Sequence, residues 1–320
     1  MLIIPLGDPY SINIAAISKL LPRTPSNPTI LIGSHKQWLH QIPADQLWLR
    51  EIPVHDRLGH FSQPTYYFLN IDVTHSPLIP PEHLDLVSRG RISVQSLQPI
   101  HEIKSNRLAV LTCPINKAAC QAAGFKFPGQ TEFFEYIWEK NGIMIMHSQT
   151  LSIGLVTNHI PLVDVTSKVN PSLIIEKARN FRRTLKKIRK INQPNIAICG
   201  LNPHAGEDGL CGNHEKEIIE PAIHKLGKGF HGPISADTAF YRSIHGEFDG
   251  VLAMYHDQGL APIKTLFFDQ TINITGGLKH FRCSPDHGPA ADKYLSKRFS
   301  LKSFSLAFQA CNDYLSEIDK

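Results

Sequence analysis

The sequence predicts an α/β protein with a mostly parallel sheet and about two domains. Short runs rich in aliphatic and β-branched residues alternate with helical stretches along the chain, which is typical of βαβ units. The 320 residues correspond to about two domains of ordinary size. With 42% hydrophobic and 19% charged residues, the composition is that of a folded globular chain, and it excludes disordered, collagenous and low-complexity classes.

Six short runs are predicted as strands, in order along the chain: residues 2–4, 29–32, 108–112, 153–157, 195–199 and 251–255. Residues 172–191 are predicted as a helix because apolar residues recur there at helical spacing. These are Ile174, Ile175, Ala178, Phe181, Leu185 and Ile188. We expect the chain to pass from one domain to the other near Asn141-Gly142 and within residues 293–300. We expect a discontinuous first lobe, residues 1–148 with 300–320, and a second lobe, residues 149–299.

Much of the basic charge of the chain is concentrated in the predicted helix 172–191. The net charge is +5, but residues 177–190 contain eight of the 33 Lys and Arg residues and no acid, which leaves −3 for the rest. A basic amphipathic helix usually has one packed and one solvated face, and it can also bind an anionic partner. We expect a solvated face, with nucleic acid a disfavoured partner.

The sequence contains no signal for a membrane or an oxidising compartment. No run approaches the ~18 apolar residues of a membrane span, and Met1–Asp8 has no charged region ahead of its apolar residues, so we expect no signal peptide. The six cysteines are scattered without a C-x-x-C pair, which favours reduced thiols over disulfides or a zinc ribbon. We therefore expect a cytoplasmic protein.

Three histidines each follow an apolar run that is predicted as a strand: His159, His204 and His256. In open parallel sheets ligands bind beyond the carboxyl ends of the strands, so these imidazoles can converge from remote parts of the sequence. Three neutral imidazoles with open positions describe a catalytic Zn²⁺ site, with Co²⁺ as an alternative, and nearby carboxylates admit Mg²⁺. A single histidine after a strand is more often a hydrogen-bonded loop residue.

Polar groups suited to anions accompany these histidines. The segment 200–212 around His204 combines two acids with four glycines, and small residues let backbone N–H groups approach an anion. Lys264 and Arg282 are donors suited to phosphate or carboxylate, and Asp257 and Asp286 are acid–base candidates. No G-x-G-x-x-G, G-x-x-x-x-G-K-[ST] or G-x-S-x-G motif occurs. The residues alone indicate metal-assisted chemistry on a small anionic substrate.

Several long motifs closely resemble the 4-hydroxythreonine-4-phosphate dehydrogenase family of pyridoxal phosphate biosynthesis. The most specific are Gly200-Leu-Asn-Pro-His-Ala-Gly-Glu and Met254-Tyr-His-Asp-Gln-Gly-Leu. The likeness runs from about residue 108 to 288 and includes Thr112-x-Pro-x-x-Lys117, Gly129-x-Thr-Glu-Phe-Phe134, Thr157-x-His-x-Pro-Leu162, Ala236-Asp-Thr238, Asn273-Ile-Thr275 and Ser284-x-Asp-His-Gly288. Residues 20–105 match only loosely.

The resemblance implies two α/β/α lobes similar to those of isocitrate and isopropylmalate dehydrogenases, with the active site in the interlobe cleft of a homodimer. It implies NAD, or NADP, as the cofactor. The implied metal ligands are His159, His204 and His256, and the implied substrate contacts are Gln130, Thr131, Lys264, Asn273 and Arg282. Four matched positions are candidates for the general base: Lys117, Asp237, Asp257 and Asp286.

The implied reaction is oxidation of the C3 hydroxyl of 4-phosphohydroxy-L-threonine, followed by decarboxylation to 3-amino-2-oxopropyl phosphate. This chain departs from the family pattern at three places. Gln130 replaces a histidine, Ser11 and Asn13 replace glycines, and Cys113 stands where the family favours glycine. Two alternatives therefore stay open: a dehydrogenase for another phosphorylated 3-hydroxy acid, and a non-catalytic descendant that binds an anionic partner through helix 172–191.

Overall fold

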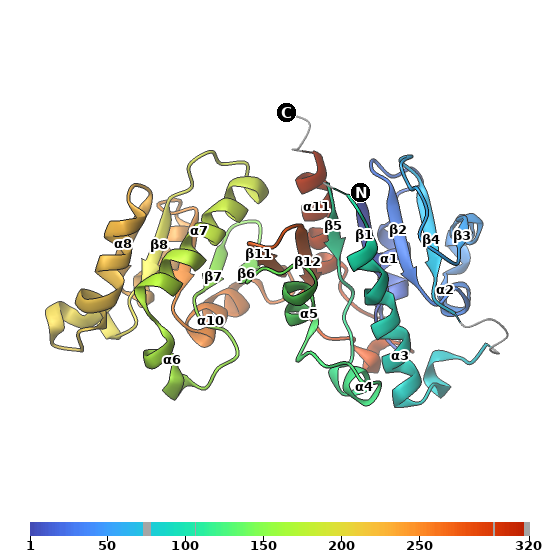
Figure 1. The fold of residues 1–320 in the computed structure, drawn as a ribbon, viewed down its shortest axis with the longest axis horizontal. Helices are drawn as coiled ribbons and strands as arrows, with labels where there is room; N and C mark the ends of the chain where they lie inside the picture. Colours follow the sequence, from blue (N-terminus) through green and yellow to red (C-terminus); the bar gives the residue numbers. More distant parts are fainter. Residues whose placement is uncertain (73–77, 106, 297, 317–320) are drawn as a thin grey trace. The chain divides into compact units, whose positions relative to one another are not determined.

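The computed structural model describes residues 1–72, 78–105, 107–296 and 298–316 (Figure 1). The chain divides into two compact units, residues 1–139 with 279–320, and residues 140–278. The sequence placed these boundaries at 148 and 300. They fall earlier in the structure because β6 (Ile143–His147) pairs with strands of the second unit, and β12 (Phe281–Pro285) pairs with β5 (Ala109–Leu111) of the first.

The first unit is built on a parallel sheet in the order β3-β4-β2-β1-β5-β12. Its remaining strands are β1 (Leu2–Pro5), β2 (Thr29–Gly33), β3 (Val54–His55) and β4 (Tyr66–Asn70). Its helices are α1 (Asn13–Leu20), α2 (His35–Gln41), α3 (Leu86–Leu97), α4 (Lys117–Ala122), α5 (Gln130–Ile137) and α11 (Lys302–Ser316). Short 3₁₀ helices are η1 (Ala44–Glu51), η2 (Pro81–His83), η3 (Gln98–Glu102) and η6 (Ala291–Lys293).

The second unit has a mixed sheet in the order β11-β6-β7-β10-β8-β9. β7 (Ser152–Leu155), β10 (Gly250–Ala253), β8 (Ile196–Cys199) and β9 (Phe230–Ile234) are parallel, whereas β6 is antiparallel to both β7 and β11 (Ile272–Gly276). Its helices are α6 (Leu162–Lys168), α7 (Pro171–Ile188), α8 (Glu220–Leu226), α9 (Ala236–Ile244) and α10 (His256–Phe267), with a short 3₁₀ segment η4 (Pro203–Gly209) and a π-helical segment η5 (Glu215–Ile219).

The predicted α/β class and the six predicted strands are confirmed; these strands are β1, β2, β5, β7, β8 and β10. The predicted basic helix is α7, which begins after Asn170, whose side chain accepts a hydrogen bond from the backbone N–H of Leu173. Within the described residues, no helix combines the length and the apolar character that crossing a bilayer requires.

The apolar face of α7 packs directly on the strands that lead to the histidines. Phe181 and Leu185 are fully buried, and burial of each contributes about 1.5–3 kcal/mol. The contact is close because the strands have glycine below the helix. A Cβ at Gly154 of β7 would lie 2.9 Å from the Phe181 ring, and one at Gly250 of β10 would lie 2.7 Å from Leu185. Side chains at these two positions would push the helix off the sheet.

Candidate active site

The three candidate metal ligands follow three neighbouring parallel strands of the second unit. His159 follows β7, His256 begins α10 directly after β10, and His204 lies in η4 after β8. Because β7, β10 and β8 are adjacent and parallel, their carboxyl ends form one edge of the sheet. All three histidine-bearing segments therefore leave the sheet at the same edge.

Hydrogen bonds join the three histidine-bearing segments to one another. The Thr157 hydroxyl donates to the carbonyl of Met254 at 2.7 Å, which ties the His159 segment to the His256 segment. The Gln258 side chain accepts from the backbone N–H of Met254 at 2.7 Å and donates to the carbonyl of Gly200 at 2.8 Å. Gln258 thus connects the end of β10 to the end of β8, where the His204 segment begins.

Two of the histidines lie close together, and two have a carboxylate beside Nδ1. The ring centroids of His159 and His256 are 5.4 Å apart. His256 Nδ1 lies 2.7 Å from Asp257 Oδ1, and His204 Nδ1 lies 4.0 Å from Asp237 Oδ2. The short contact orients the His256 ring and leaves its Nε2 for another partner, whereas 4.0 Å is too long for a hydrogen bond to His204. Within the described part of the chain, no three His, Cys, Asp or Glu side chains form a group that could hold a metal ion.

His204 is carried on a strained backbone turn. Five consecutive residues, 204–208, have φ between 42° and 82°, the left-handed region, and only Gly206 among them is a glycine. L-residues in this region are held there only by strong surrounding contacts. Gly206 is required at its position for a second reason, because a Cβ there would lie 2.6 Å from the Glu215 carboxylate.

The buried carboxylate of Glu215 fixes the segment that leads into this turn. Its Oε1 accepts hydrogen bonds from the backbone N–H groups of Leu201 at 2.7 Å and Asn202 at 2.8 Å, and Oε2 accepts from Asn202 Nδ2 at 2.9 Å. Burial raises the pKa of Glu215, but the hydrogen bonds from Asn202 and Leu201 outweigh it, so the pKa lies below its usual value. Two backbone N–H groups of the segment 200–212, for which the sequence suggested an anion, therefore bind a carboxylate of the chain itself.

A second group of predicted residues lies in the first unit around Arg282 of β12. The Arg282 side chain is 3% exposed and donates to the hydroxyl of Thr112 from Nε and Nη2, at 3.1 and 2.8 Å. Its Nη1 donates to the hydroxyl of Thr131 at 3.2 Å, and its guanidinium lies 5.7 Å from the Phe134 ring. Burial lowers the pKa of Arg282 to about 10, so the side chain stays charged near neutral pH and is oriented by hydroxyl groups.

Gln130 and Lys117 lie next to this group. Gln130 Nε2 donates to the carbonyl of Cys113 at 3.0 Å, while Gln130 Oε1 is buried and has no hydrogen-bond partner among the described residues. Lys117 is exposed at the start of α4, and its side chain reaches Gly129, the residue before α5. Four predicted residues, Lys117, Gln130, Thr131 and Arg282, are thus brought together around residues 112–113.

The remaining predicted residues are more dispersed. Lys264 lies on α10 with Nζ 5.3 Å from the Phe268 ring centroid, and Asp286 follows β12, its backbone N–H bonded to the Ser303 hydroxyl. Strand β11 pairs with β6, with Ile272 opposite His147, and this end of β6 pairs with the amino end of β7. Asn273 therefore lies near the amino end of β7, whereas His159 follows the carboxyl end of that strand. The structure does not bring Asn273 to the histidine edge.

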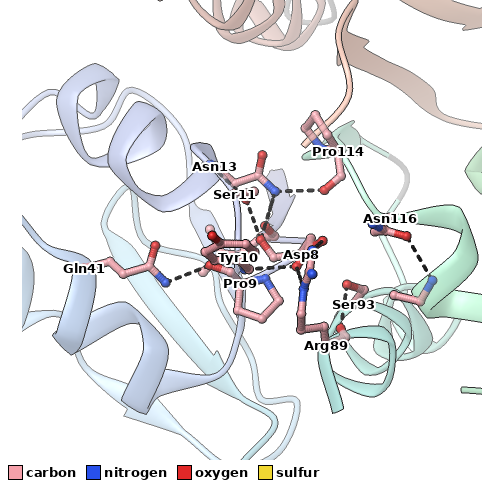
Figure 2. A network of polar contacts seen from close by, with 12 residues as sticks. Asp8, Pro9, Tyr10, Ser11, Asn13, Gln41, Arg89, Ser93, Pro114 and Asn116 are labelled. Atoms are coloured by element: carbon pink, nitrogen blue, oxygen red, sulfur yellow. Dashed lines mark hydrogen bonds and ion pairs between the residues drawn. The ribbon is translucent and has the colours of Figure 1, made fainter. Parts of the chain in front are cut away.

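The β1–α1 loop, where Ser11 and Asn13 replace glycines, is filled by its own side chains (Figure 2). Asn13 is fully buried, and its Nδ2 donates to the carbonyls of Leu6 at 2.9 Å and Pro114 at 2.8 Å. The Ser11 hydroxyl donates to the carbonyl of Asp8 at 2.5 Å. Both side chains therefore bond to backbone carbonyls, and Asn13 fixes the loop to the segment after β5.

The same loop contains a buried ion pair. Asp8 is fully buried and accepts two hydrogen bonds from Arg89 of α3, at 2.6 Å from Nη2 and 3.1 Å from Nε (Figure 2). The Arg89 guanidinium also lies 4.9 Å from the Tyr10 ring. A bidentate pair with a stacked guanidinium fixes the geometry of both partners. The network therefore fixes three segments relative to one another. These are the loop that follows β1, helix α3, and the segment that follows β5.

Three positioning residues were not identified as such from the sequence: Glu215, Gln258 and Thr112. Gln258 and Thr112 stood inside recognised motifs, but their partners lie on other strands, so nothing in the local pattern assigns them a role. Glu215 lies 13 residues after Asn202, its hydrogen-bond partner. A buried acid in a polar segment of mixed charge carries no signal that distinguishes it from the exposed acids around it.

The comparisons with known proteins agree with these motifs. Residues 27–311 match the family model of the pyridoxal phosphate biosynthetic protein PdxA. The 4-hydroxythreonine-4-phosphate dehydrogenase of Aquifex aeolicus is 35% identical over 322 residues, 98% of both chains. The D-threonate 4-phosphate dehydrogenase of Cupriavidus necator is 44% identical over 189 residues, 58% of this chain and 56% of that protein. Matches to the first three curated relatives span 56–64% of their length.

The fold agrees with a solved structure. The crystal structure of a 4-hydroxythreonine-4-phosphate dehydrogenase from Klebsiella pneumoniae superimposes with a TM-score of 0.78 at 27% sequence identity, over 99% of this chain and 98% of that one. The likeness thus extends over the whole chain, including residues 20–105, where the sequence motifs match only loosely.

Proposed function

Because the chain belongs to the PdxA family of pyridoxal phosphate biosynthetic proteins, we propose that it oxidises 4-phosphohydroxy-L-threonine at the C3 hydroxyl, with NAD as the hydride acceptor. A base of the chain would take the hydroxyl proton, and NAD, when bound, would supply the acceptor for the hydride from C3. The resulting β-keto acid then loses its carboxylate as CO₂, and a proton is added at C2 to give 3-amino-2-oxopropyl phosphate. The observation that supports this most strongly is the joined set of histidine segments beside two carboxylates.

We propose that the donors at the sheet edge bind a divalent ion of the Zn²⁺ class. His256 Nδ1 lies 2.7 Å from the Asp257 carboxylate, the arrangement found in proteins that bind a metal through the other ring nitrogen, and the Asp237 carboxylate lies 4.0 Å from His204 Nδ1. When bound, such an ion supplies Lewis acidity to the oxygen that is oxidised. We propose His159, His204 and His256 as its ligands, with Zn²⁺ preferred and Co²⁺ or Mg²⁺ as alternatives.

Two cations, one from each unit, are suited to hold an anionic substrate. Arg282 of the first unit offers a charged, buried guanidinium oriented by Thr112 and Thr131, and Lys264 on α10 of the second unit offers a point charge for a second anionic group. Fixing both anionic groups directs the C3–H bond toward the hydride acceptor. Because Asp237 and Asp257 pair with histidines, we propose Lys117 or Asp286 as the group that takes the hydroxyl proton.

We propose NAD or NADP from family membership, and we propose that it does not bind at the β1–α1 loop. In a Rossmann fold the pyrophosphate lies on the loop between the first strand and the first helix. Here that loop carries Ser11 and Asn13, whose side chains occupy its interior and bind its own carbonyls. We therefore propose a cofactor site elsewhere, in agreement with the absence of a G-x-G-x-x-G motif.

We also propose a homodimer that completes the metal site. The described residues of one chain do not form a three-ligand group, and the segments around the histidines expose large apolar side chains. Val163 is 82% exposed shortly after His159, and Leu210 is 84% exposed shortly after His204. Exposed apolar residues of this size mark interaction surfaces. Light scattering, which gives the molar mass in solution, tests the dimer with the wild type and with the variants Val163→Glu and Leu210→Glu. We expect a dimeric wild type and weakened dimers in the variants, and a monomeric wild type would contradict the proposal.

The side chain of Gln130 supports a second candidate for the substrate. The unpartnered Oε1 of Gln130 accepts a hydrogen bond but carries no charge at any pH, so it suits a hydroxyl on C2 as well as an ammonium group. D-threonate 4-phosphate, the compound in the name of the Cupriavidus necator relative, has a hydroxyl there. We therefore regard a dehydrogenase for another phosphorylated 3-hydroxy acid as the alternative function.

The test is turnover of both compounds by the metal-loaded protein, followed by NADH absorbance. We expect NADH and 3-amino-2-oxopropyl phosphate in equal amounts from 4-phosphohydroxy-L-threonine, and loss of activity in His256→Ala. Faster turnover of D-threonate 4-phosphate would select the alternative. No NADH from either compound, with Zn²⁺, Co²⁺ or Mg²⁺ and with NAD or NADP, would contradict both.

A further inference from the structure

The basic face of α7 forms one wall of a groove on the second unit that the proposed reaction does not use. The groove has a volume of about 550 Å³ and is lined by Arg179, Arg182, Arg183, Lys186, Asn192, Pro194, Leu226 and Phe230. The four cations occupy successive turns of one helix, so they form a row about 10 Å long. Its size is within the range of small-molecule sites.

One of the four cations is held rigidly at the wall. Arg182 Nη1 donates to the carbonyl of Lys228 at 2.9 Å, and the guanidinium lies 4.9 Å from the Phe230 ring. It also lies against Gly229, where a Cβ would be only 3.0 Å from Arg182 Nη2. An arginine fixed in this way needs no further ordering when it binds an anion.

No carboxylate of the described residues neutralises the charge of the groove. Among the described residues, no carboxylate lies within ion-pair distance of the four lining cations, and Arg183 bonds only to the side-chain amide of Asn180. Like charges three and four residues apart on a helix repel one another. A bound polyanion relieves this repulsion and gains charge-assisted hydrogen bonds from the arginines.

We propose that this groove binds a small phosphorylated organic molecule with at least two phosphate charges. Its phosphates contact the row of cations, and its organic part packs on Pro194 and Leu226 opposite them. A small ligand is favoured over nucleic acid for two reasons. The cations form one short row in a concave site, and the chain outside residues 177–190 has a net charge of −3, which repels a long polyanion.

The test is calorimetric titration of the full-length protein with inorganic tripolyphosphate and with ATP, at about 150 mM salt, where exposed charges are screened. We expect both to bind, and ATP to bind more tightly because it has an organic part. The double substitution Arg183→Glu and Lys186→Glu should weaken binding by about tenfold or more, equivalent to ~1.4 kcal/mol. Lys187→Glu makes the charge change of one of these two substitutions on the same helix outside the lining, and it should change affinity by less than about threefold.

Hydrogen exchange locates the site independently of the variants. We expect tripolyphosphate to protect peptides covering residues 179–194 and 226–230. Equal affinity of the double variant and Lys187→Glu, or protection confined to other segments, would overturn the proposal. Tighter binding of a 12-nucleotide single-stranded RNA than of ATP at these residues would overturn it in favour of a nucleic-acid surface. If charge reversal prevents folding, Arg179→Gln at an exposed position replaces the double variant. None of these readouts depends on dehydrogenase activity.

Discussion

Replacing Glu215 with glutamine tests whether its buried carboxylate holds the turn that carries His204. The substitution keeps the shape of the side chain and removes its charge. Glu215 is 2% exposed and accepts three hydrogen bonds from Leu201 and Asn202. The amide oxygen can still accept from the two backbone N–H groups, but its NH₂ group would face the donor Asn202 Nδ2.

The cost follows from these three contacts. Each of the two backbone hydrogen bonds changes from charge-assisted to neutral, at about 1 kcal/mol each, and the bond from Asn202 Nδ2 is lost, at about 1 kcal/mol more. Removing a buried charge offsets part of this. We expect Glu215→Gln to lower the free energy of unfolding by about 2–3 kcal/mol. Because the turn is strained, its relaxation should also weaken metal binding by about 10–100-fold.

Urea denaturation and equilibrium dialysis with Zn²⁺ measure the two effects. Glu217→Gln is the matched control, since Glu217 is exposed two residues further on and its substitution should change stability by less than about 0.5 kcal/mol. The pH dependence adds a further check. Because folding lowers the pKa of Glu215, its carboxylate stabilises the folded protein at pH values above the pKa of the unfolded state. This contribution to stability is lost as the pH falls. Equal stability and equal Zn²⁺ affinity of the two variants would refute the role assigned to Glu215.

Three further predictions concern other parts of the molecule. Arg89→Ala leaves the fully buried Asp8 without its ion-pair partner, so it should lower the free energy of unfolding by about 3–5 kcal/mol in urea denaturation; a loss below about 1 kcal/mol contradicts this. Burial lowers the pKa of His147 to about 3, so the folded state disfavours its charged form. Stability should fall by about 1.4 kcal/mol per pH unit as the pH drops from 6.5 toward 3, and a smaller slope is expected for His147→Gln. Asp257→Asn removes the carboxylate beside His256 Nδ1 and should weaken Zn²⁺ binding by about tenfold in dialysis without changing stability by more than about 1 kcal/mol; unchanged affinity contradicts the pairing.

The sequence predicts strands and histidine segments well where a local pattern is sufficient. Strands β7, β8 and β10 are short aliphatic runs buried on both faces, and that pattern is visible in any window of the chain. Their common direction follows from the βαβ alternation, and it places His159, His204 and His256 at one edge. The bounds of helix α7 are predicted to within about three residues because apolar residues recur along it at regular helical spacing.

What the sequence does not predict depends on contacts between distant segments. The left-handed turn at residues 204–208 is stabilised by Glu215, and glycine content alone suggested an open anion-binding loop. The sequence shows that Asn13 replaces a glycine but not what it binds, because its partners Leu6 and Pro114 lie in segments whose proximity only the fold establishes. The unit boundaries were shifted because the pairing of β6 and β12 was not visible in their composition.

The central claim is that His159, His204 and His256 bind one divalent ion. Crystals of the protein grown with Co²⁺, with diffraction data collected at the cobalt absorption edge, test this directly. We predict a single anomalous peak at about 2.0–2.1 Å from a ring nitrogen of each histidine, with ligands drawn from one or both copies of the chain. A fully occupied cobalt site away from these three rings, or no peak beside them at saturating Co²⁺, would contradict it.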